Sequence, residues 1–404
     1  MKVLSIIFAT IILSSCNNLQ APAQVKNETS EAKTKLIQVS TSEELIAALN
    51  DPKPGDSIVV RAGTYKLDER IYINDSGNKG GTIYLIGDIS KERPLLDFSA
   101  MEEDSSNQGI VLKADNWHIK GFRVFKAGDN GLQIRGNNNL IEFCSFSECR
   151  DTGLQIDDGA SKNTILNCDS YYNADSSMKN ADGFAVKMAV GSDNKFIGCR
   201  AWNNSDDGWD GYLRGADNVT TIYENCWSFK NGFLKDGTNG KGDGNGFKTG
   251  GSDSKLTKHN ASFFRCIAVD NVSDGFDHNS NRGTVSIINC SATGNGRNIA
   301  FAETLSLEKI VLLNTVVLGD YGKYNGESQL VENNSWEFDF EVSEDNFVSV
   351  DSKELEKVRK KDGNLPDLDF MKPKRTSELA KIKPSKKSNK YSNVSFIGAV
   401  EIDK

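Results

Sequence analysis

Apolar residues alternate with polar residues in short runs that end at a cysteine throughout the middle of the chain. The runs NTILNC, NKFIGC, TIYENC, SFFRC and SIINC end at Cys168, Cys199, Cys226, Cys266 and Cys290. A second short run follows each of these cysteines and closes on asparagine, as in CRAWNN and CIAVDN. Alternation with a period of two predicts β-strands, and these strands are too short and too evenly spaced to alternate with crossover helices.

A second repeat, a polar residue followed by glycine and a large apolar residue, occurs six times between residues 130 and 280. Its glycines are Gly131, Gly153, Gly183, Gly208, Gly246 and Gly275, which lie 22 to 38 residues apart. Spacings in this range are typical of stacked repeats. Each coil then consists of a strand, a cysteine, a strand, an asparagine turn, a glycine and a strand. We therefore expect an all-β fold, a right-handed parallel β-helix.

The segment before the coils predicts an N-terminal capping helix. Thr41 and Glu44 have the spacing of a capping box, and Leu45 and Leu49 belong to one apolar stripe. The sequence from Pro52 to Gly55 ends the helix before the first strand. Because a solenoid needs its open core end covered, we expect this helix to lie over that end.

The composition fits one long β-helix domain, residues 36–350, followed by a C-terminal basic segment and cap, residues 351–404. The 36 glycines and only 7 prolines among 404 residues give the turn content of a β-helix, which grows without the size limit of a compact core. The Lys-rich run within the second segment is typical of a solvated face. A net charge of −8 and a pI of about 5.2 argue against a nucleic-acid or general polyanion binder.

The amino terminus predicts a lipoprotein signal peptide, residues 1–16. It has a basic start at Lys2, an apolar run and then LSSC, the small-residue box that precedes a lipid-modified cysteine in bacteria. The apolar run is too short to span a membrane. Residues 17–35, poor in large apolar side chains, predict a flexible tether. We expect export and lipid anchoring through Cys16 to the outer membrane, facing the periplasm or the medium; a soluble secreted protein is the alternative.

Seven cysteines remain when Cys16 is set aside, and an odd number cannot all pair within the chain. Their place at one point of each repeat favours a buried ladder of reduced cysteines over a disulfide framework. A bridge between Cys144 and Cys149 stays an alternative that we do not predict. No CxxC or Cys/His spacing indicates zinc.

Charged residues gather at two positions of the glycine repeat. Asn130, Thr152, Asp182, Asp207, Asn245 and Asp274 stand directly before the glycine, and Gln133, Gln155, Ala185, Asp210, Lys248 and Asp277 stand two residues after it. Equivalent residues of successive coils lie about 4.8 Å apart. The register therefore brings Asp182 next to Asp207, with Asp206 beside them, and it places Asp210 one rung from Lys248.

Carboxylates at this density repel one another unless their pKa values rise or they hold a cation. Their hard oxygen atoms suit Ca²⁺, so we predict a calcium site formed by Asp182, Asp206, Asp207 and Asp210. Common Asp-Gly turn chemistry is the alternative for any single copy. Lys248 is the candidate general base, because a nearby divalent cation lowers a lysine pKa from its ordinary value of about 10.4. A solvated surface charge is the alternative for this lysine.

Five motifs carry a family resemblance. DGFAVK at 182, NSDDGWDGY at 204, ENCWSFKNG at 224, GNGFKTGG at 244 and DGFDHNSNRG at 274 resemble polysaccharide lyase family 9, the pectate lyases with a parallel β-helix. The resemblance extends from about residue 36 to the end of the coils. It implies calcium held by the four aspartates named above, with Lys248 as the catalytic base. The implied reaction is β-elimination on a uronate, which needs no organic cofactor and gives a 4,5-unsaturated product.

Lys187, Arg214 and Arg282 lie near these motifs and are candidates for binding further substrate carboxylates. We expect pectate or polygalacturonate as the acidic polysaccharide substrate, with rhamnogalacturonan, alginate and glycosaminoglycan-like polymers left open. A β-helix glycoside hydrolase with paired carboxylates and a non-catalytic carbohydrate-binding β-helix are the alternatives from other classes. We expect a monomer that contacts the membrane only through its lipid. The Gly-rich insertion 233–244 predicts a flexible loop beside the site.

Overall fold

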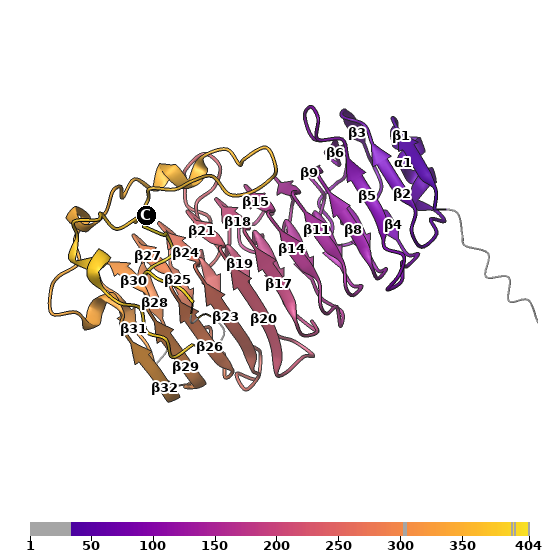
Figure 1. The fold of residues 1–404 in the computed structure, drawn as a ribbon. Coiled ribbons are helices and arrows are strands. Elements are labelled where there is room, and N and C mark those ends of the chain that lie inside the picture. The colour runs from indigo at the N-terminus through magenta and orange to yellow at the C-terminus, as the bar shows by residue number, and fades with distance from the viewer. Residues whose placement is uncertain (1–33, 302–304, 389–390, 392, 403–404) are drawn as a thin grey trace, which may run out of the picture. The chain divides into compact units, whose positions relative to one another are not determined.

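The structure is a computed structural model that describes residues 34–301, 305–388, 391 and 393–402. The predicted signal peptide, Cys16 and most of the predicted tether lie outside these residues. In the described part, the strands form three parallel sheets of 12, 10 and 10 strands, and each complete coil contributes one strand to each sheet in turn (Figure 1). The predicted parallel β-helix is confirmed.

Sheet 1 consists of β1 (Leu36–Val39), β2 (Ser57–Val60), β5 (Ile83–Gly87), β8 (Trp117–Lys120), β11 (Leu140–Glu142), β14 (Thr164–Leu166), β17 (Asn194–Ile197), β20 (Val219–Glu224), β23 (His259–Phe264), β26 (Thr284–Ile288), β29 (Leu307–Leu313) and β32 (Gly326–Glu332). Sheet 2, which carries the glycine repeat, consists of β4 (Ile71–Ile73), β7 (Ile110–Leu112), β10 (Leu132–Ile134), β13 (Leu154–Ile156), β16 (Phe184–Val186), β19 (Trp209–Asp210), β22 (Phe247–Lys248), β25 (Asp274–Asp277), β28 (Arg297–Ala300) and β31 (Gly322–Lys323). Sheet 3 consists of β3 (Thr64–Lys66), β6 (Leu95–Asp97), β9 (Arg123–Phe125), β12 (Ser145–Ser147), β15 (Asp169–Tyr171), β18 (Arg200–Trp202), β21 (Trp227–Phe229), β24 (Ile267–Val269), β27 (Ser291–Thr293) and β30 (Val316–Leu318).

Helix α1 (Ser42–Leu49) forms where the sequence predicts it, at the N-terminal end of the stack (Figure 1). The hydroxyl of Thr41 accepts a hydrogen bond from the backbone N–H of Glu44, and the carboxylate of Glu44 accepts one from the backbone N–H of Ser40. Leu45 and Leu49 are buried in the same core as the first strands. Glu44 thus reaches the residue before the N-cap, so half of the expected capping box forms, and the Thr41 cap and the apolar stripe together fix the position of this helix.

The glycine repeat allows neighbouring coils of sheet 2 to approach closely. A Cβ atom on Gly183 would lie 2.8 Å from the carbonyl oxygen of Gly208, and one on Gly208 would lie 2.6 Å from that of Gly246. The large apolar residue after each glycine points into the core, where Trp209 and Phe247 stack with ring centroids 4.8 Å apart. The motif thus combines a close backbone contact with an aromatic stack, a favourable arrangement of rings.

Two ladders of equivalent residues run along the coils, one of cysteines and one of asparagines. The seven cysteines that the structure describes are all buried and free, as predicted. The turn asparagines form a continuous chain in which each Nδ2 donates to the Oδ1 of the next coil at 2.8 to 2.9 Å, from Asn173 through Asn204, Asn231 and Asn271 to Asn295. Each rung leaves its amide satisfied, so these buried polar groups stabilise the stack rather than weaken it.

The C-terminal segment turns back along sheet 3, and Figure 1 shows it in yellow beside β21, β24 and β27. Two short 3-10 helices, η1 (Ser335–Glu337) and η2 (Glu344–Asn346), precede this segment, and two more, η3 (Ser352–Glu356) and η4 (Glu378–Lys381), lie within it. Leu355, Phe370 and Met371 form a second apolar core with Phe229 and Val269. The basic run is not solvated throughout, because the Arg359 side chain is only 4% exposed.

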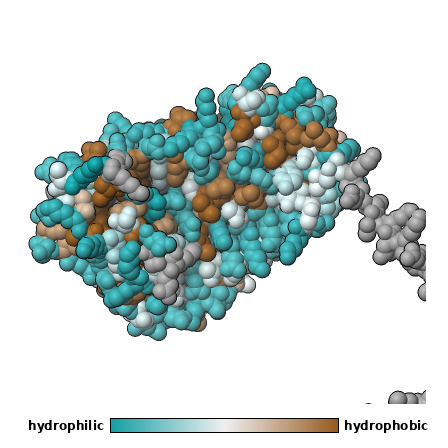
Figure 2. All heavy atoms as spheres, viewed as in Figure 1, coloured by the Kyte–Doolittle hydropathy of each residue, from teal (hydrophilic) through white to brown (hydrophobic). Residues whose placement is uncertain are grey.

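Polar residues dominate the face of the molecule drawn in Figure 2, with separate apolar patches between them. Strands such as β20 explain this distribution, since every second residue is buried and the others point outward. Among the described residues, no helix has the length and apolar character needed to cross a membrane.

Candidate active site

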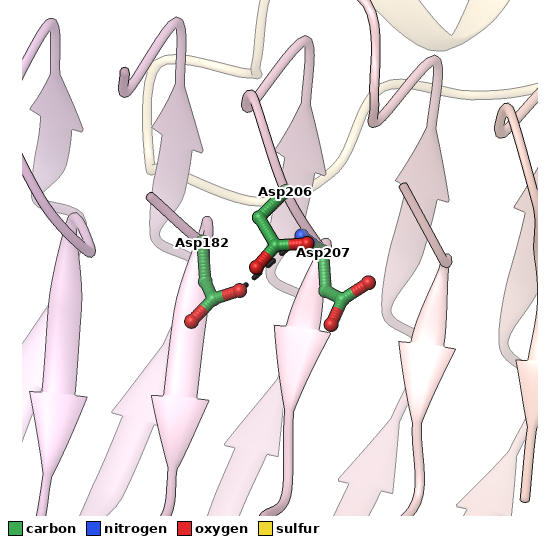
Figure 3. A group of neighbouring side chains, drawn as sticks. All are labelled: Asp182, Asp206 and Asp207. Atoms are coloured by element: carbon green, nitrogen blue, oxygen red, sulfur yellow. Dashed lines mark hydrogen bonds between the residues drawn. The ribbon is translucent and has the colours of Figure 1, made fainter. Parts of the chain in front are cut away.

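Three carboxyl groups from two successive coils meet at the edge of sheet 2. Asp182 stands before β16, and Asp206 and Asp207 stand before β19. One oxygen atom of each carboxyl group lies within 4.8 Å of the others, and Figure 3 shows the three side chains together. The backbone N–H of Asp207 donates to Oδ1 of Asp182 at 3.2 Å, which joins the two coils. The proximity that the register predicts for these residues is confirmed.

Lys248 lies opposite Asp210 on the adjacent strand, again as the register predicts. Its Nζ lies 3.1 Å from Oδ2 of Asp207 and 3.8 Å from Oδ1 of Asp210. The Lys248 side chain is only 11% exposed. The predicted base is therefore part of the carboxylate cluster and not an ordinary surface lysine.

Lys187 enters the same cluster. Its Nζ lies 2.8 Å from Oδ2 of Asp182 and 3.3 Å from Oδ2 of Asp210. Because its side chain is only 13% exposed, it serves as an internal counter-ion of these two aspartates. Contact of Lys187 with substrate stays a prediction.

Arg214 and Arg282 have other partners. Arg214 is exposed and forms a bidentate pair with Asp253, at 2.8 and 3.0 Å. Arg282 lies 3.7 Å from a carboxylate oxygen of Glu327. The structure thus brings Lys187 to the aspartates and gives the two arginines separate acidic partners.

Burial of the aspartates in this cluster disfavours their ionised form. Burial and the neighbouring Asp182 carboxylate raise the pKa of Asp206 to about 8. Burial also raises the pKa values of Asp182 and Asp207. Asp210 differs, because the ammonium groups of Lys248 and Lys187 lower its pKa although burial opposes them. The carboxylates in turn raise the pKa of Lys248 despite its burial, so the lysine is an ammonium ion in this arrangement.

This arrangement fits a divalent cation. The fully buried Oδ2 of Asp207 accepts no hydrogen bond, although the Lys248 ammonium lies nearby. With all four carboxyl groups ionised, as metal ligands are, their charges against the two ammonium groups leave two negative charges among the six side chains. Carboxylate oxygens grouped within 4.8 Å are the ligands that Ca²⁺ prefers. One Ca²⁺ ion would balance the charge and give Oδ2 of Asp207 a partner in addition to its ion pair with Lys248.

Three further residues complete the surroundings of the cluster. The hydroxyl of Thr152 donates to Oδ2 of Asp182 at 3.1 Å. Burial raises the pKa of Asp151, a neighbour of Lys187, to about 7. Asp243 accepts a hydrogen bond from Nζ of Lys248 at 3.1 Å. The register includes Thr152 but indicates no role for it, and Asp243 lies in the insertion, where the register does not apply.

The Gly-rich insertion is held against the site by hydrogen bonds. The backbone N–H of Asp243 donates to Oδ1 of Asp206 at 2.6 Å, and that of Lys241 donates to the carbonyl of Met178 at 2.7 Å. An antiparallel bridge joins Phe233 and Asn239. The sequence predicts a flexible loop here, whereas the structure shows a loop with defined contacts to the aspartates.

The sequence is similar to a known β-helix family and to proteins named pectate lyases. Residues 25–325 match the family described as "Pel9A-like, right handed beta helix region". Pectate lyase L of Dickeya chrysanthemi is 34% identical over 366 residues, which cover 87% of this chain and 83% of that protein. Pectate lyase L of Paenibacillus polymyxa is 41% identical over 274 residues, covering 64% of this chain and 60% of that protein.

Solved structures agree with the sequence matches. The crystal structure of pectate lyase Pel9A superposes with a TM-score of 0.81 at 32% identity, covering 93% of this chain and 98% of that one. A rhamnogalacturonan lyase superposes with a TM-score of 0.74 at 26% identity, covering 85% of this chain and 98% of that one.

Proposed function

Because this chain belongs to the Pel9A-like right-handed β-helix family of polysaccharide lyases, as its motifs predict, we propose that it cleaves pectate by calcium-dependent β-elimination. The observation that carries the proposal is the position of Lys248. This lysine lies beside a cluster of buried aspartates that has an excess of negative charge, and it forms an ion pair with a buried oxygen of Asp207 that accepts no hydrogen bond. A glycoside hydrolase uses a pair of carboxylates and gives this lysine no catalytic role.

Asp182, Asp206 and Asp207 would hold the ion together with Asp210, which lies on β19, the strand that follows Asp206 and Asp207. When bound, Ca²⁺ would supply charge stabilisation for the substrate carboxylate and make the C5 proton more acidic. Lys187 would keep Asp182 and Asp210 in place, since its ammonium contacts both.

Lys248 would take the C5 proton as general base. The electron pair of the C5–H bond forms the C4=C5 double bond, and the C4–O glycosidic bond breaks with the pair leaving on oxygen. Deprotonation of the lysine becomes easier once its carboxylate neighbours are engaged, because those carboxylates are what raise its pKa. Arg214 and Arg282 are the proposed contacts for carboxylates of neighbouring sugars; replacing either by alanine should raise KM and leave kcat near wild type.

The test is a direct assay. Purified protein is mixed with polygalacturonate, and the ultraviolet absorbance of the unsaturated uronate is followed with Ca²⁺ and then with a chelator. A rise that the chelator stops supports the proposal. Release of reducing ends without ultraviolet absorbance would instead indicate a hydrolase, and binding without either signal would indicate a carbohydrate-binding module.

Rhamnogalacturonan is the second candidate substrate, favoured by the similarity to a rhamnogalacturonan lyase over 85% of this chain. Both polymers contain uronate, so the same elimination chemistry serves each. Parallel assays on the two polymers, compared by kcat/KM, decide between them.

We also propose that the protein is exported as a monomer and anchored to the bacterial outer membrane through a lipid on Cys16. The support is the LSSC sequence after a short apolar run. Metabolic labelling with a radioactive fatty acid should mark the wild-type chain and leave Cys16→Ser unlabelled. Equal labelling of both would refute the anchor.

A further inference from the structure

The insertion 233–244, here called the strap, supplies one of the three carboxylates that contact the candidate base Lys248. Oδ2 of Asp243 accepts a hydrogen bond from Nζ of Lys248 at 3.1 Å. The other two carboxylates paired with this ammonium are Asp207 and Asp210. Both of those belong to the proposed calcium ligands, whereas Asp243 does not.

The strap is anchored on both sides of this contact. The backbone N–H of Gly240 donates to the carbonyl of Gly232 at 2.6 Å, and that of Asp243 donates to Oδ1 of Asp206 at 2.6 Å. The hydroxyl of Ser273, in the following coil, donates to the carbonyl oxygen of Asp243. Asp243 is thus fixed through its backbone, and its side chain is free to hold the lysine.

The glycines of the strap provide independent support. A Cβ atom on Gly242 would lie 2.7 Å from the Cγ atom of Asp206, and one on Gly240 would lie 2.5 Å from the carbonyl oxygen of Ser205. These distances are shorter than ordinary contacts, so only glycine lets the strap lie this close to Asp206. The Gly-rich sequence of the insertion is therefore matched to the site.

We propose that Asp243 is a positioning residue that holds Nζ of Lys248 while the other aspartates bind calcium; this rests on the function proposed above. Once Asp207 and Asp210 bind the metal ion, their oxygens are shared with it and hold the Lys248 ammonium less strongly than before. Asp243 stays outside the ligand set, with its side chain 65% exposed, and keeps the lysine at the substrate. The strap therefore links the position of the lysine to the metal site, because its backbone N–H at Asp243 also binds Asp206, a proposed calcium ligand.

The experiment compares Asp243→Ala with Asp243→Asn in the full chain. Asp243→Ala should lower kcat about 10- to 100-fold, the range for partners that orient active-site groups, and leave KM within about threefold. Asp243→Asn keeps an acceptor oxygen and should restore most of kcat. The control is Asp236→Asn in the same strap, whose carboxylate contacts Thr238 and should leave kcat unchanged.

Calcium binding is measured separately by calorimetry with CaCl₂ alone. Asp243→Ala should bind calcium with less than about a threefold change, because the backbone N–H to Asp206 remains. Gly242→Ala should weaken calcium binding by about tenfold or more, since its Cβ would displace Asp206. Wild-type kcat in Asp243→Ala, or a loss of kcat explained by weaker calcium binding, would overturn the proposal.

Failure of the proposed function has a different signature. If the wild-type protein eliminates no uronate polymer, the reaction proposed above is wrong whatever the variants do. Crystal structures of the calcium-loaded wild type and Asp243→Ala then decide the inference alone. The proposal requires Nζ of Lys248 to lie within hydrogen-bond distance of Asp243 in the first and to move away from that position in the second.

Discussion

Sheets 2 and 3 each have buried aspartates beside them, but the pKa values of these aspartates shift in opposite directions. On sheet 3, Asp169 lies between Arg200 and Arg359, at 2.8 and 2.7 Å, and the two guanidinium groups lower its pKa although burial opposes them. On sheet 2, burial raises the pKa values of Asp206 and Asp207. The first carboxylate is fully compensated by the chain itself, and the second pair is not.

This difference separates structure from function. The Asp169 cluster fastens the C-terminal segment to the coils, since Arg359 comes from that segment and Arg200 also donates to the carbonyls of Leu355 and Lys357. A buried charge that keeps an excess of like neighbours costs stability unless a ligand provides the balance. The predictions below test this contrast.

Lys248→Ala should produce the largest effect. Loss of a general base typically lowers kcat by about 10² to 10⁴, so we expect elimination to fall by that factor while calcium binding persists. The control Lys195→Ala removes an exposed lysine of sheet 1 and should leave turnover unchanged. Intact turnover in Lys248→Ala would show that the base is another residue.

Asp169→Asn should destabilise the protein by about 3–5 kcal/mol, because it leaves two buried guanidinium groups without their carboxylate. Chemical denaturation measures the free energy of unfolding. Asp339→Asn, at an exposed position between η1 and η2, is the control and should change it little. A loss as small as that of the control would mean that the cluster does not hold the segment.

Asp207→Asn should have the opposite effect on the metal-free protein. A folded state that raises the pKa of this carboxyl group disfavours its ionised form, so the neutral amide should raise Tm without calcium. The same change should weaken calcium binding about 10- to 100-fold by calorimetry, because a charged ligand is lost. Unchanged calcium affinity would remove Asp207 from the ligand set.

The pH dependence of stability should sharpen the contrast on sheet 3. Asp169 has a folded pKa below its unfolded value of about 3.9, so its stabilisation is fully present above that value and is lost as the pH falls through the lower, folded pKa. The Tm difference between wild type and Asp169→Asn should therefore be constant near neutrality and shrink below about pH 4. A difference that stays constant into acid would assign the stabilisation to packing instead.

Much of the fold could be predicted because its interactions repeat. Alternating strands, buried free cysteines and the pairing of Asp210 with Lys248 all follow from a period and a register, and the helix after Thr41 follows from its local capping residues and apolar stripe. The C-terminal segment could not be predicted in this way. Its Lys-rich run indicates a solvated face, but Arg359 is buried against Asp169, a contact 190 residues away along the chain.

The site likewise has one part that the repeat predicts and one part that it does not. Register alone groups Asp182, Asp206 and Asp207. It cannot show that Lys187 turns inward to Asp182, or that Asp243 reaches Lys248, because each depends on a side-chain direction or a loop path outside the repeat.

The coil, its register and the grouping of the aspartates with Lys248 follow from the amino-acid sequence alone, since strand pairing converts a linear period directly into a fixed spacing between neighbours. Which of the charges are compensated depends on the folded arrangement of the whole chain. Burial and the approach of distant segments, such as the strap and the C-terminal segment, set the local balance of charge, and no linear period encodes those contacts.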